Sequence, residues 1–251
     1  MAPLSVIPLS GIGEVHPHDD LPQILSAAIH RLTITPAPHD VLVIAQKVVS
    51  KSENRYVDLD SVHVSEEAER LATITRKDPR LIQLVLSEST EVLRAKRDVL
   101  IVRHRLGYVM ANAGIDRSNL GGENRVLLLP QDPDASAAQL RTKLATSLGV
   151  ELGVVICDSF GRPWRKGVTN VALGAAGLPS LIDRRGEADR NGRKLEVTEV
   201  AFADLIASAA GLVMGEGAEG VPAALLQGLK WSATSNNAAA LLRPVQEDLF
   251  R

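Results

Sequence analysis

The sequence has little of the material on which several classes of protein depend. Its single cysteine, Cys157, excludes an internal disulfide and a zinc site built from several cysteines. Aromatic residues make up only 3% of the chain, so platforms that stack single-stranded nucleic acid are not expected. The net charge is −2 and there is no long basic run, which argues against a nucleic-acid partner. The expected partner is therefore a small molecule.

Long apolar runs are also missing. No stretch approaches the roughly 20 apolar residues that a membrane span needs. The first residues lack the basic region and the continuous apolar region of a signal peptide. We therefore expect no membrane partner and a cytoplasmic location. Apolar residues form 45% and charged residues 23% of the 251 residues, which is typical of one large globular domain or of two lobes sharing a core.

Apolar residues recur at helical spacing in four places. The predicted helices are Leu21–Leu32, a helix opened by Asp78-Pro79 and running through Val85, a helix capped by Asp134 or Ser136 and stopped at Gly149, and a helix from about Thr198 to Ala210 that ends at Gly211.

Short apolar runs between these helices predict strands. They are Val41–Ala45, Val99–Val102, Tyr108–Ala111, Val126–Leu129, Val154–Cys157, Leu212–Met214 and Ala223–Leu226. Residues 104–107 fit the loop of a hairpin, which makes part of the sheet antiparallel. Cys157, at the end of one apolar run, is predicted to be a packed core thiol. The pattern predicts an α/β or α+β fold with mixed sheets rather than a regular doubly wound sheet.

Four of these strands are each followed by a polar segment, and three of the four segments contain glycine. The segments are residues 46–51, 112–119, 158–167 and 215–220. Loops at the carboxyl ends of strands are where α/β proteins bind ligands. We therefore expect the four segments to build one site.

The residue types in these segments suit phosphate chemistry. Asp116, Asp158 and Glu216 offer the carboxylate oxygens that Mg²⁺ and Mn²⁺ prefer. Cations that can hold phosphates or carboxylates are Lys47, Lys51, Arg162, Arg165 and Lys166. A metal between carboxylates and phosphate oxygens, with cations around it, is the usual equipment for phosphoryl transfer.

Each residue also has a simpler interpretation. An aspartate after a strand is often a turn former or a helix cap, and Lys47 and Lys51 taken alone fit solvated charges. Trp164 fits a side chain packed against the sheet as well as a functional one. His16-Pro17-His18 fits a surface turn better than a metal pair, and Gly11–Glu14 is neither of the common glycine-rich phosphate motifs. The hypothesis depends on the four segments together.

At these segments the sequence resembles the coenzyme F-420-0:L-glutamate ligases, also called F-420:gamma-L-glutamyl ligases. The matching segments, in the order of the family, are PLSGIGE (8–14) with Asp19-Asp20, AQKVVSKSENR (45–55), ANAGIDRSN (111–119), LPQDPDASA (129–137), DSFGRPWRKG (158–167), GAAGL (174–178) and VTEVAFAD (197–204). They run from residue 8 to about residue 228, and residues 101–119 and 158–167 carry the most specific similarity.

The resemblance implies a GTP-dependent ligase that adds L-glutamate to the deazaflavin precursor F-420-0, extends it through gamma links, and releases GDP and phosphate. It also implies two divalent metal ions, Mn²⁺ or Mg²⁺, a homodimer, and one family domain over residues 1–251 made of two interlocked α/β subdomains. Relatives that reduce the precursor carry a further flavin-binding domain, and no flavin is expected here.

The resemblance also assigns roles to residues. Asp116 and Asp158 would hold one metal, and Ser159, which replaces the family's usual threonine, would hold the second with Glu216. Lys51 would hold the transferring phosphoryl group. The GTP site would be lined by Gly11, Ile12, Gly13, Glu14, Gln46, Lys47, Lys51, Asn119, Met214, Gly215, Glu216, Gly217, Ala218 and Glu219. The residues themselves leave two other possibilities open, namely another metal-dependent phosphoryl-transfer enzyme and a nucleotide-binding module without catalysis.

Overall fold

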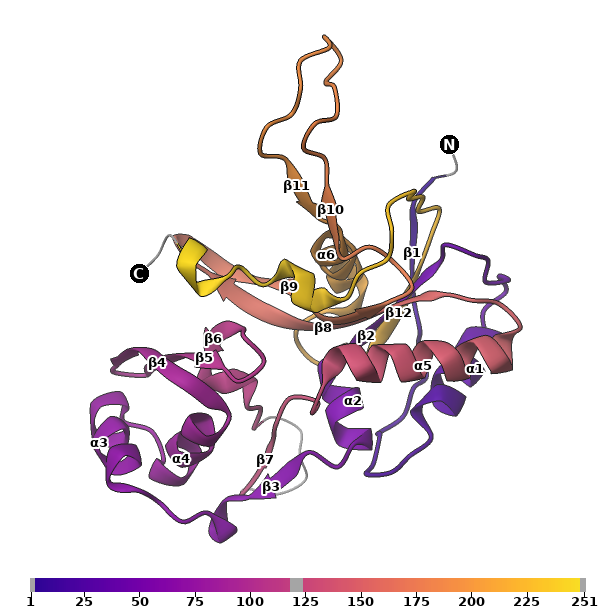
Figure 1. Cartoon of the computed structure of the whole chain (residues 1–251). Coiled ribbons are helices and arrows are strands. Elements are labelled where there is room, and N and C mark those ends of the chain that lie inside the picture. Colours follow the sequence, from indigo (N-terminus) through magenta and orange to yellow (C-terminus); the bar gives the residue numbers. More distant parts are fainter. Residues whose placement is uncertain (1–2, 118–123, 249–251) are drawn as a thin grey trace. The chain divides into compact units, whose positions relative to one another are not determined.

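A computed structural model describes residues 3–117 and 124–248, and the predicted site residue Asn119 lies outside them (Figure 1). The chain divides into two compact units. Unit 1 consists of the chain up to Val15, of Asp19–Val49 and of the chain from Asp132 onward, and unit 2 consists of His16–His18 and Ser50–Gln131.

Unit 1 is built on a mixed five-stranded sheet with the order β1-β12-β2-β8-β9. The strands are β1 (Ser5–Pro8), β2 (Val41–Ala45), β8 (Gly153–Arg162), β9 (Arg165–Ala176) and β12 (Ala223–Gln227). Only β2 and β8 pair in parallel, and every other pairing in this sheet is antiparallel. The predicted mixed α+β architecture is therefore confirmed.

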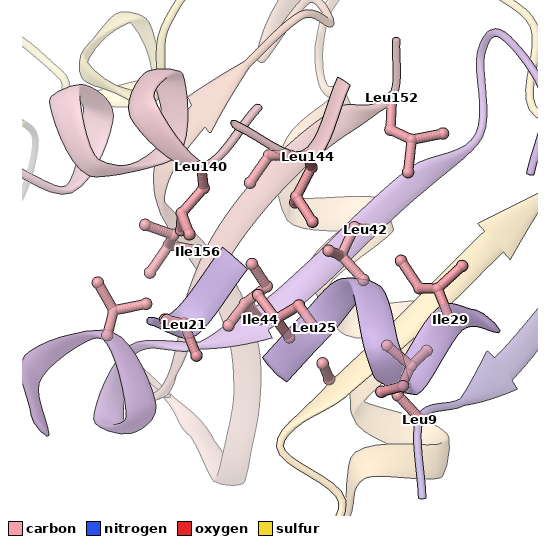
Figure 2. Packing of buried hydrophobic residues seen from close by; sticks show 14 of the residues in the cluster. Leu9, Leu21, Leu25, Ile29, Leu42, Ile44, Leu140, Leu144, Leu152 and Ile156 are labelled. Atoms are coloured by element: carbon pink, nitrogen blue, oxygen red, sulfur yellow. The ribbon is translucent and has the colours of Figure 1, made fainter. Parts of the chain in front are cut away.

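Helices cover both faces of this sheet. Leu42 and Ile44 of β2 and Ile156 of β8 face α1 (Leu21–His30) and α5 (Pro133–Leu148), where Figure 2 shows the leucine and isoleucine side chains interlocking. Val43 and Cys157 point to the other face, against α6 (Phe202–Met214). Because β2 and β8 are covered on both faces, their sequences are continuous apolar runs. Cys157 is buried, as predicted.

The predicted helix starts and stops are partly wrong. Helix α5 ends at Gly149 as expected, but its N-cap is Asp132, whose Oδ1 accepts a hydrogen bond from Ala135 N at 3.0 Å. Asp134 instead reaches out of the helix, and its Oδ1 accepts from the backbone N–H groups of Ala175 and Ala238, each at 2.8 Å. The aspartate that resembles a cap therefore joins α5 to β9 and to the C-terminal segment.

The predicted strand Leu212–Met214 is wrong, because these residues form the last turn of α6. The helix starts late, at Phe202, because Glu199–Ala201 pairs as β11 with β10 (Leu181–Asp183). It also continues through Gly211. A Cβ at Gly211 would lie 2.8 Å from Asn170 Nδ2, so this glycine admits a close neighbour and does not end the helix, which stops at Gly215.

Unit 2 contains the remaining elements. They are β3 (Tyr56–Asp58) paired with β7 (Arg125–Leu127), the antiparallel sheet of β4 (Ser89–Lys96), β5 (Val99–His104) and β6 (Val109–Ala111), and the helices α3 (Glu66–Thr75) and α4 (Pro79–Ser87). The hairpin predicted at residues 104–107 is confirmed, with Gly107 N donating to His104 O at 2.7 Å. Asp78 caps α4 as predicted.

Some shorter elements complete the chain. Helix α2 (Gln46–Ser52) begins in unit 1 and ends in unit 2, and the short helices are η1 (Leu59–Ser61), η2 (Asn112–Gly114), η3 (Ala238–Leu241) and η4 (Val245–Glu247). Over residues 3–117 and 124–248, no helix is both long enough and apolar enough to span a bilayer.

Candidate active site

The register of the unit 1 sheet brings several predicted site segments to one edge. Pro8, at the end of β1, pairs with Ala224, near the start of antiparallel β12, and Ala223 pairs with Ile44, next to the end of β2. Ala45 in turn pairs with Cys157 of the parallel strand β8. The residues that follow β1 and β2 and those that precede β12 therefore lie at the same edge of the sheet, and β8 reaches that edge at Cys157. This is the expected place for a ligand in a sheet of this kind.

The first of these segments is the start of α2. Gln46 is buried and Lys47 is half-buried, and both follow β2 without an intervening loop. Ala45 N donates to Pro222 O at 2.8 Å, which ties the strand end to the residues just before β12. The prediction that β2 delivers a loop is therefore wrong, because a helix begins at once. Gln46 and Lys47 are nevertheless delivered to the predicted edge.

Asp158 and Ser159 stand where β8 passes this edge. Both are half-buried, and they pair with Val171 and Asn170 of β9. The prediction of a loop over residues 158–167 is wrong, because β8 continues to Arg162 and β9 begins at Arg165. The segment is therefore a β-hairpin, and the ladder of hydrogen bonds fixes the direction of Asp158 more firmly than a loop would.

Asp204 supports β9 next to these residues. Its Oδ1 accepts a hydrogen bond from Ala172 N at 2.8 Å, at the point where the register between β8 and β9 shifts. Burial raises the pKa of Asp204, and the hydrogen bond from Ala172 opposes that rise. Asp204 lies in the VTEVAFAD segment, one of those that resemble the ligase family. The sequence did not predict a role for its carboxylate.

The segment before β12 carries the second carboxylate of this edge. Gly215 ends α6, and Glu216 is exposed in the following turn. Burial raises the pKa of the Cys157 thiol well above its usual range, and the negative charges of Asp158 and Glu216 raise it further. Both carboxylates therefore act on the same buried atom, which places them at the same end of β8.

The rest of the 214–219 segment divides by role. Met214 is buried in the core under α6, so its side chain is not available to a ligand. Glu219 folds back on its own turn, where Oε2 accepts from Gly217 N at 2.7 Å. Ala218 is exposed. The backbone of this turn and the side chain of Glu216 are what the segment presents at the edge.

The Gly11–Glu14 segment follows β1 at the same edge. Arg31 donates from Nη2 to Ser10 O at 3.3 Å and to Gly11 O at 3.2 Å, which holds the segment against the end of α1. Ile12 packs against the core beneath, while Gly13 has open space around it. An open backbone next to an arginine suits the approach of an anion.

Unit 2 carries the other two predicted catalytic residues. Asp116 exchanges two backbone hydrogen bonds of 2.9 Å with Leu127, and its side chain is half-buried. Lys51 is buried in the last turn of α2, which Arg55 N closes by donating to Ser50 O at 2.9 Å. Leu128 N donates to Arg55 O at 3.0 Å. Leu127 and Leu128 therefore connect the segment that carries Asp116 to the residues that follow Lys51.

The donor set of the unit 1 edge suits a hard divalent cation. Asp158, Ser159 and Glu216 supply two carboxylates and a hydroxyl, which are oxygen ligands of the kind that Mg²⁺ and Mn²⁺ take. Burial is the main cause of the raised pKa of the Cys157 thiol, and the negative charges of these two carboxylates add to it; the same charges attract a cation. Among the described residues, no group of three or more His, Cys, Asp and Glu side chains is gathered closely enough to hold a metal. A cation here would need oxygens beyond these carboxylates.

Unit 2 also holds a charged cluster that the sequence did not point to. Glu88 Oε2 lies 3.1 Å from Arg105 Nε, 3.5 Å from Arg55 Nη2 and 3.4 Å from Nε2 of the buried His104. His104 Nδ1 accepts from Leu106 N at 3.0 Å, so the neutral ring carries its proton on Nε2, facing Glu88. The His104 ring, then Arg105 and Arg55, hold the pKa of Glu88 below its usual range, although burial raises it.

This cluster predicts a pH-dependent contribution to stability. Because the folded-state pKa of Glu88 is lowered, its stabilisation is present above the unfolded value of about 4.3 and is lost as the pH falls through the folded value. Glu88→Gln should lower the free energy of unfolding at neutral pH by about 1.5–3 kcal/mol, as for hydrogen bonds to a charged group. The difference from the unaltered protein should be smaller at pH 3 than at neutral pH, because the stabilisation is lost progressively below the unfolded value. Urea unfolding at both pH values measures it.

Glu67→Gln is the matched control, because Glu67 pairs with Arg70 on the exposed surface of α3. It should change the unfolding free energy much less than Glu88→Gln does, because solvent screens an exposed ion pair. An equal loss at neutral and acid pH for Glu88→Gln would contradict the charged role of Glu88.

The similarity of this chain to known proteins covers the segments that lie at the sheet edge. The family model described as F420-0:Gamma-glutamyl ligase matches residues 11–228. The chain is 43% identical over 242 residues to a coenzyme F420:L-glutamate ligase of Methanopyrus kandleri, covering 95% of this chain and 94% of the relative. It is 41% identical over 250 residues to the protein of the same name from Methanothermobacter thermautotrophicus, covering 99% of both chains. A third relative of that name, from Natronomonas pharaonis, is 43% identical over 255 residues, with 99% of this chain and 95% of the relative covered. This α+β chain, whose unit 1 sheet carries carboxylates at one edge, therefore belongs to the F420-0:gamma-glutamyl ligase family.

Proposed function

We propose that this chain joins L-glutamate to the deazaflavin F-420-0, uses GTP to do so, and extends the product through gamma-glutamyl links. The observation that carries the proposal is that the family match covers residues 11–228 and includes every segment at the unit 1 sheet edge. The relatives are named as ligases of coenzyme F420 and L-glutamate. GTP as the energy source and the gamma links follow from the resemblance and belong to the proposal.

The chemistry requires activation of a carboxylate. A carboxylate does not react with an amine directly, so one of its oxygens first attacks the γ-phosphorus of GTP and GDP leaves. The resulting acyl phosphate is then attacked by the glutamate amine, which loses a proton, and phosphate leaves with the oxygen that it received from the carboxylate. Each step moves negative charge between oxygens, so the protein contributes mainly by placing positive charge and N–H donors near them.

We assign the residues of unit 1 as follows. Asp158, Ser159 and Glu216 hold divalent metal, and the backbone of Gly11–Glu14, with Gln46, Lys47 and the turn after Met214, contacts the nucleotide. Mg²⁺ or Mn²⁺, when bound, neutralises phosphate oxygens. Two ions, the roles of Asp116, Lys51 and Asn119, and a homodimer are assigned on the resemblance.

The proposal predicts a strict requirement for all components. Purified protein, F-420-0, L-glutamate, GTP and Mn²⁺ should together give a deazaflavin product heavier by one or more glutamyl residues, together with GDP and phosphate. Omission of F-420-0, glutamate, GTP or metal should abolish the product, because each supplies an atom or a charge that the reaction needs. Mass spectrometry of the deazaflavin and a GDP assay measure the two sides of the reaction.

The two rival functions give different results in this experiment. Another phosphoryl-transfer enzyme would turn over GTP equally well without glutamate and F-420-0. A nucleotide-binding module would bind GTP and release no GDP. Either result without a glutamylated product would make the proposed function wrong.

A further inference from the structure

The tip of the β8–β9 hairpin, Arg162–Lys166, presents a large aromatic side chain to solvent. Trp164 is 83% exposed, whereas the chain's other tryptophan, Trp231, is half-buried against His39 and Phe202, with ring centroids 4.6 and 5.9 Å away. The sequence left open whether Trp164 packs against the sheet, and the structure shows that it does not. An exposed tryptophan leaves a large apolar area in water, which a planar ligand would remove.

The backbone at the tip is also unusual. Trp164 has φ +58°, in the left-handed region that bulky residues rarely occupy. A conformation of this kind is strained for a bulky residue and tends to occur at functional positions. Glycine or asparagine would take this turn position with less strain, so local folding does not favour tryptophan here. A requirement for the ring itself would account for it.

The charged residues nearest to Trp164 in the sequence are all positive. Arg162, Arg165 and Lys166 are exposed, and residues 159–168 contain no aspartate or glutamate. In the part of the chain that the structure describes, no ion pair joins any of these three cations to a carboxylate. Cations without acidic partners favour a ligand that carries negative charge.

The tip belongs to the same strand pair as Asp158. Arg162 is four residues beyond Asp158 on β8, which at about 3.3 Å per residue is a separation of roughly 13 Å. A ligand held at the tip by a ring could therefore extend along the hairpin toward Asp158. Its reacting group would then lie at the opposite end from its ring.

We propose that the hairpin tip binds the aromatic ring system of an anionic substrate, with the ring stacked on Trp164 and the neighbouring phosphate held by Arg162, Arg165 and Lys166. The identity of the ligand rests on the proposed function, which offers two molecules of this chemistry. In F-420-0 the deazaflavin ring is joined through a phosphodiester to the lactyl carboxylate. In GTP the guanine ring is joined to the triphosphate. In both, the reacting group is at the far end of a chain that carries phosphate.

The test uses the fluorescence of Trp164 as the reporter. In the Trp231→Phe variant, Trp164 is the only tryptophan, so tryptophan fluorescence reports on the hairpin tip alone. F-420-0 and GTP are titrated separately, each in the presence of Mn²⁺. Saturable quenching by F-420-0 or by GTP, together with loss of affinity for that ligand in the Trp164→Leu variant, assigns the tip to the deazaflavin ring or to the guanine ring. Quenching by neither molecule, at concentrations where equilibrium dialysis shows that they bind, overturns the proposal.

Variants at the tip give a second measurement that does not depend on folding of Trp231→Phe. Trp164→Leu should weaken binding of the assigned ligand roughly five- to 150-fold, the range found for loss of one stacked ring. Trp164→Phe should restore most of that affinity, since it keeps a ring. Affinity for the other ligand should stay within about twofold. Equal affinity of Trp164→Leu and unaltered protein for both ligands would also overturn the proposal.

Charge is tested in the same way. Arg165→Gln should weaken binding of the assigned ligand and reduce the dependence of its Kd on salt, because one screened contact is lost. Arg190→Gln is the control, as Arg190 is an exposed cation in the loop between β10 and β11. These binding measurements are independent of catalysis. Loss of the glutamylated product with the quenching retained would refute the proposed function alone.

Discussion

Replacement of Asp158 by asparagine is expected to lower the rate of glutamate ligation by about 10²–10³-fold, as for removal of one preorganised electrostatic contact at a reacting centre. The substitution keeps the size of the side chain but removes a negative charge from the sheet edge that also carries the charge of Glu216. The loss should be largest at limiting Mn²⁺ and smaller at high Mn²⁺, because metal affinity falls with ligand charge. GDP release measured against Mn²⁺ concentration gives both effects.

The lower rate can be attributed to the lost charge only if the Asp158→Asn variant folds like the unaltered protein. The hydrogen-bond ladder around Asp158 is made by the backbone, so circular dichroism and the unfolding midpoint should match those of the unaltered protein. Asp189→Asn is the matched control, since Asp189 lies in the exposed loop beyond β10 and an asparagine Oδ1 can accept the same bonds from Asn191 N and Arg193 N. Near-normal turnover by folded Asp158→Asn at limiting Mn²⁺ would mean that Asp158 is a structural residue.

Replacement of Gly174 by alanine is expected to have the largest effect on stability. A Cβ at Gly174 would lie 2.1 Å from the backbone oxygen of Pro133, at the start of α5, far inside contact distance. The backbone there cannot move freely, because Asp134 accepts from Ala175 N and Ala238 N at 2.8 Å. The free energy of unfolding should fall by at least about 3 kcal/mol, at the upper end of overpacking effects. Chemical unfolding monitored by circular dichroism measures the change.

Gly161→Ala is the control for this prediction. Gly161 is in the same strand pair, has no neighbouring atom within 4 Å of the position that a Cβ would take, and does not have a positive φ. Its replacement should be neutral or slightly stabilising, because alanine loses less conformational freedom than glycine. Similar losses for both substitutions would show that the sheet tolerates no added methyl group, and that the Pro133 contact is not the cause.

Three strands of the central sheet, β2, β8 and β12, could be predicted from the sequence because they are buried on both faces, whereas β1 and β9 were not predicted. Burial of this kind leaves a continuous apolar run, as in Val41–Ala45 and Val154–Cys157. The same signal failed at Leu212–Met214, since a short apolar run fits a buried helix turn equally well. β4 was not predicted because its residues are mostly polar and half-buried or exposed.

The candidate site was predicted in part. The segments that follow β2 and Cys157 were found because polar residues come directly after apolar strands, and the register of the sheet brings them to one edge. Gly11–Glu14, which follows β1 at the same edge, was assigned through the family resemblance alone. The hairpin at residues 158–167 resembles a loop in sequence because Gly161 and Pro163 are typical of loops. Residues such as Glu88 and Asp204 could not be found, since their roles depend on partners far away in the sequence.

The most direct test of the account follows one oxygen atom. F-420-0 with heavy oxygen in its lactyl carboxylate is incubated with the protein, GTP, L-glutamate and Mn²⁺, and the phosphate and deazaflavin are examined by mass spectrometry. Activation of the carboxylate by phosphoryl transfer predicts one heavy oxygen in the phosphate released when the first glutamate is added, together with a deazaflavin that has gained glutamate. Phosphate from later additions should carry none, because the carboxylate activated there belongs to the glutamate already added. Phosphate without heavy oxygen, released while the deazaflavin stays unglutamylated, would contradict the ligase function.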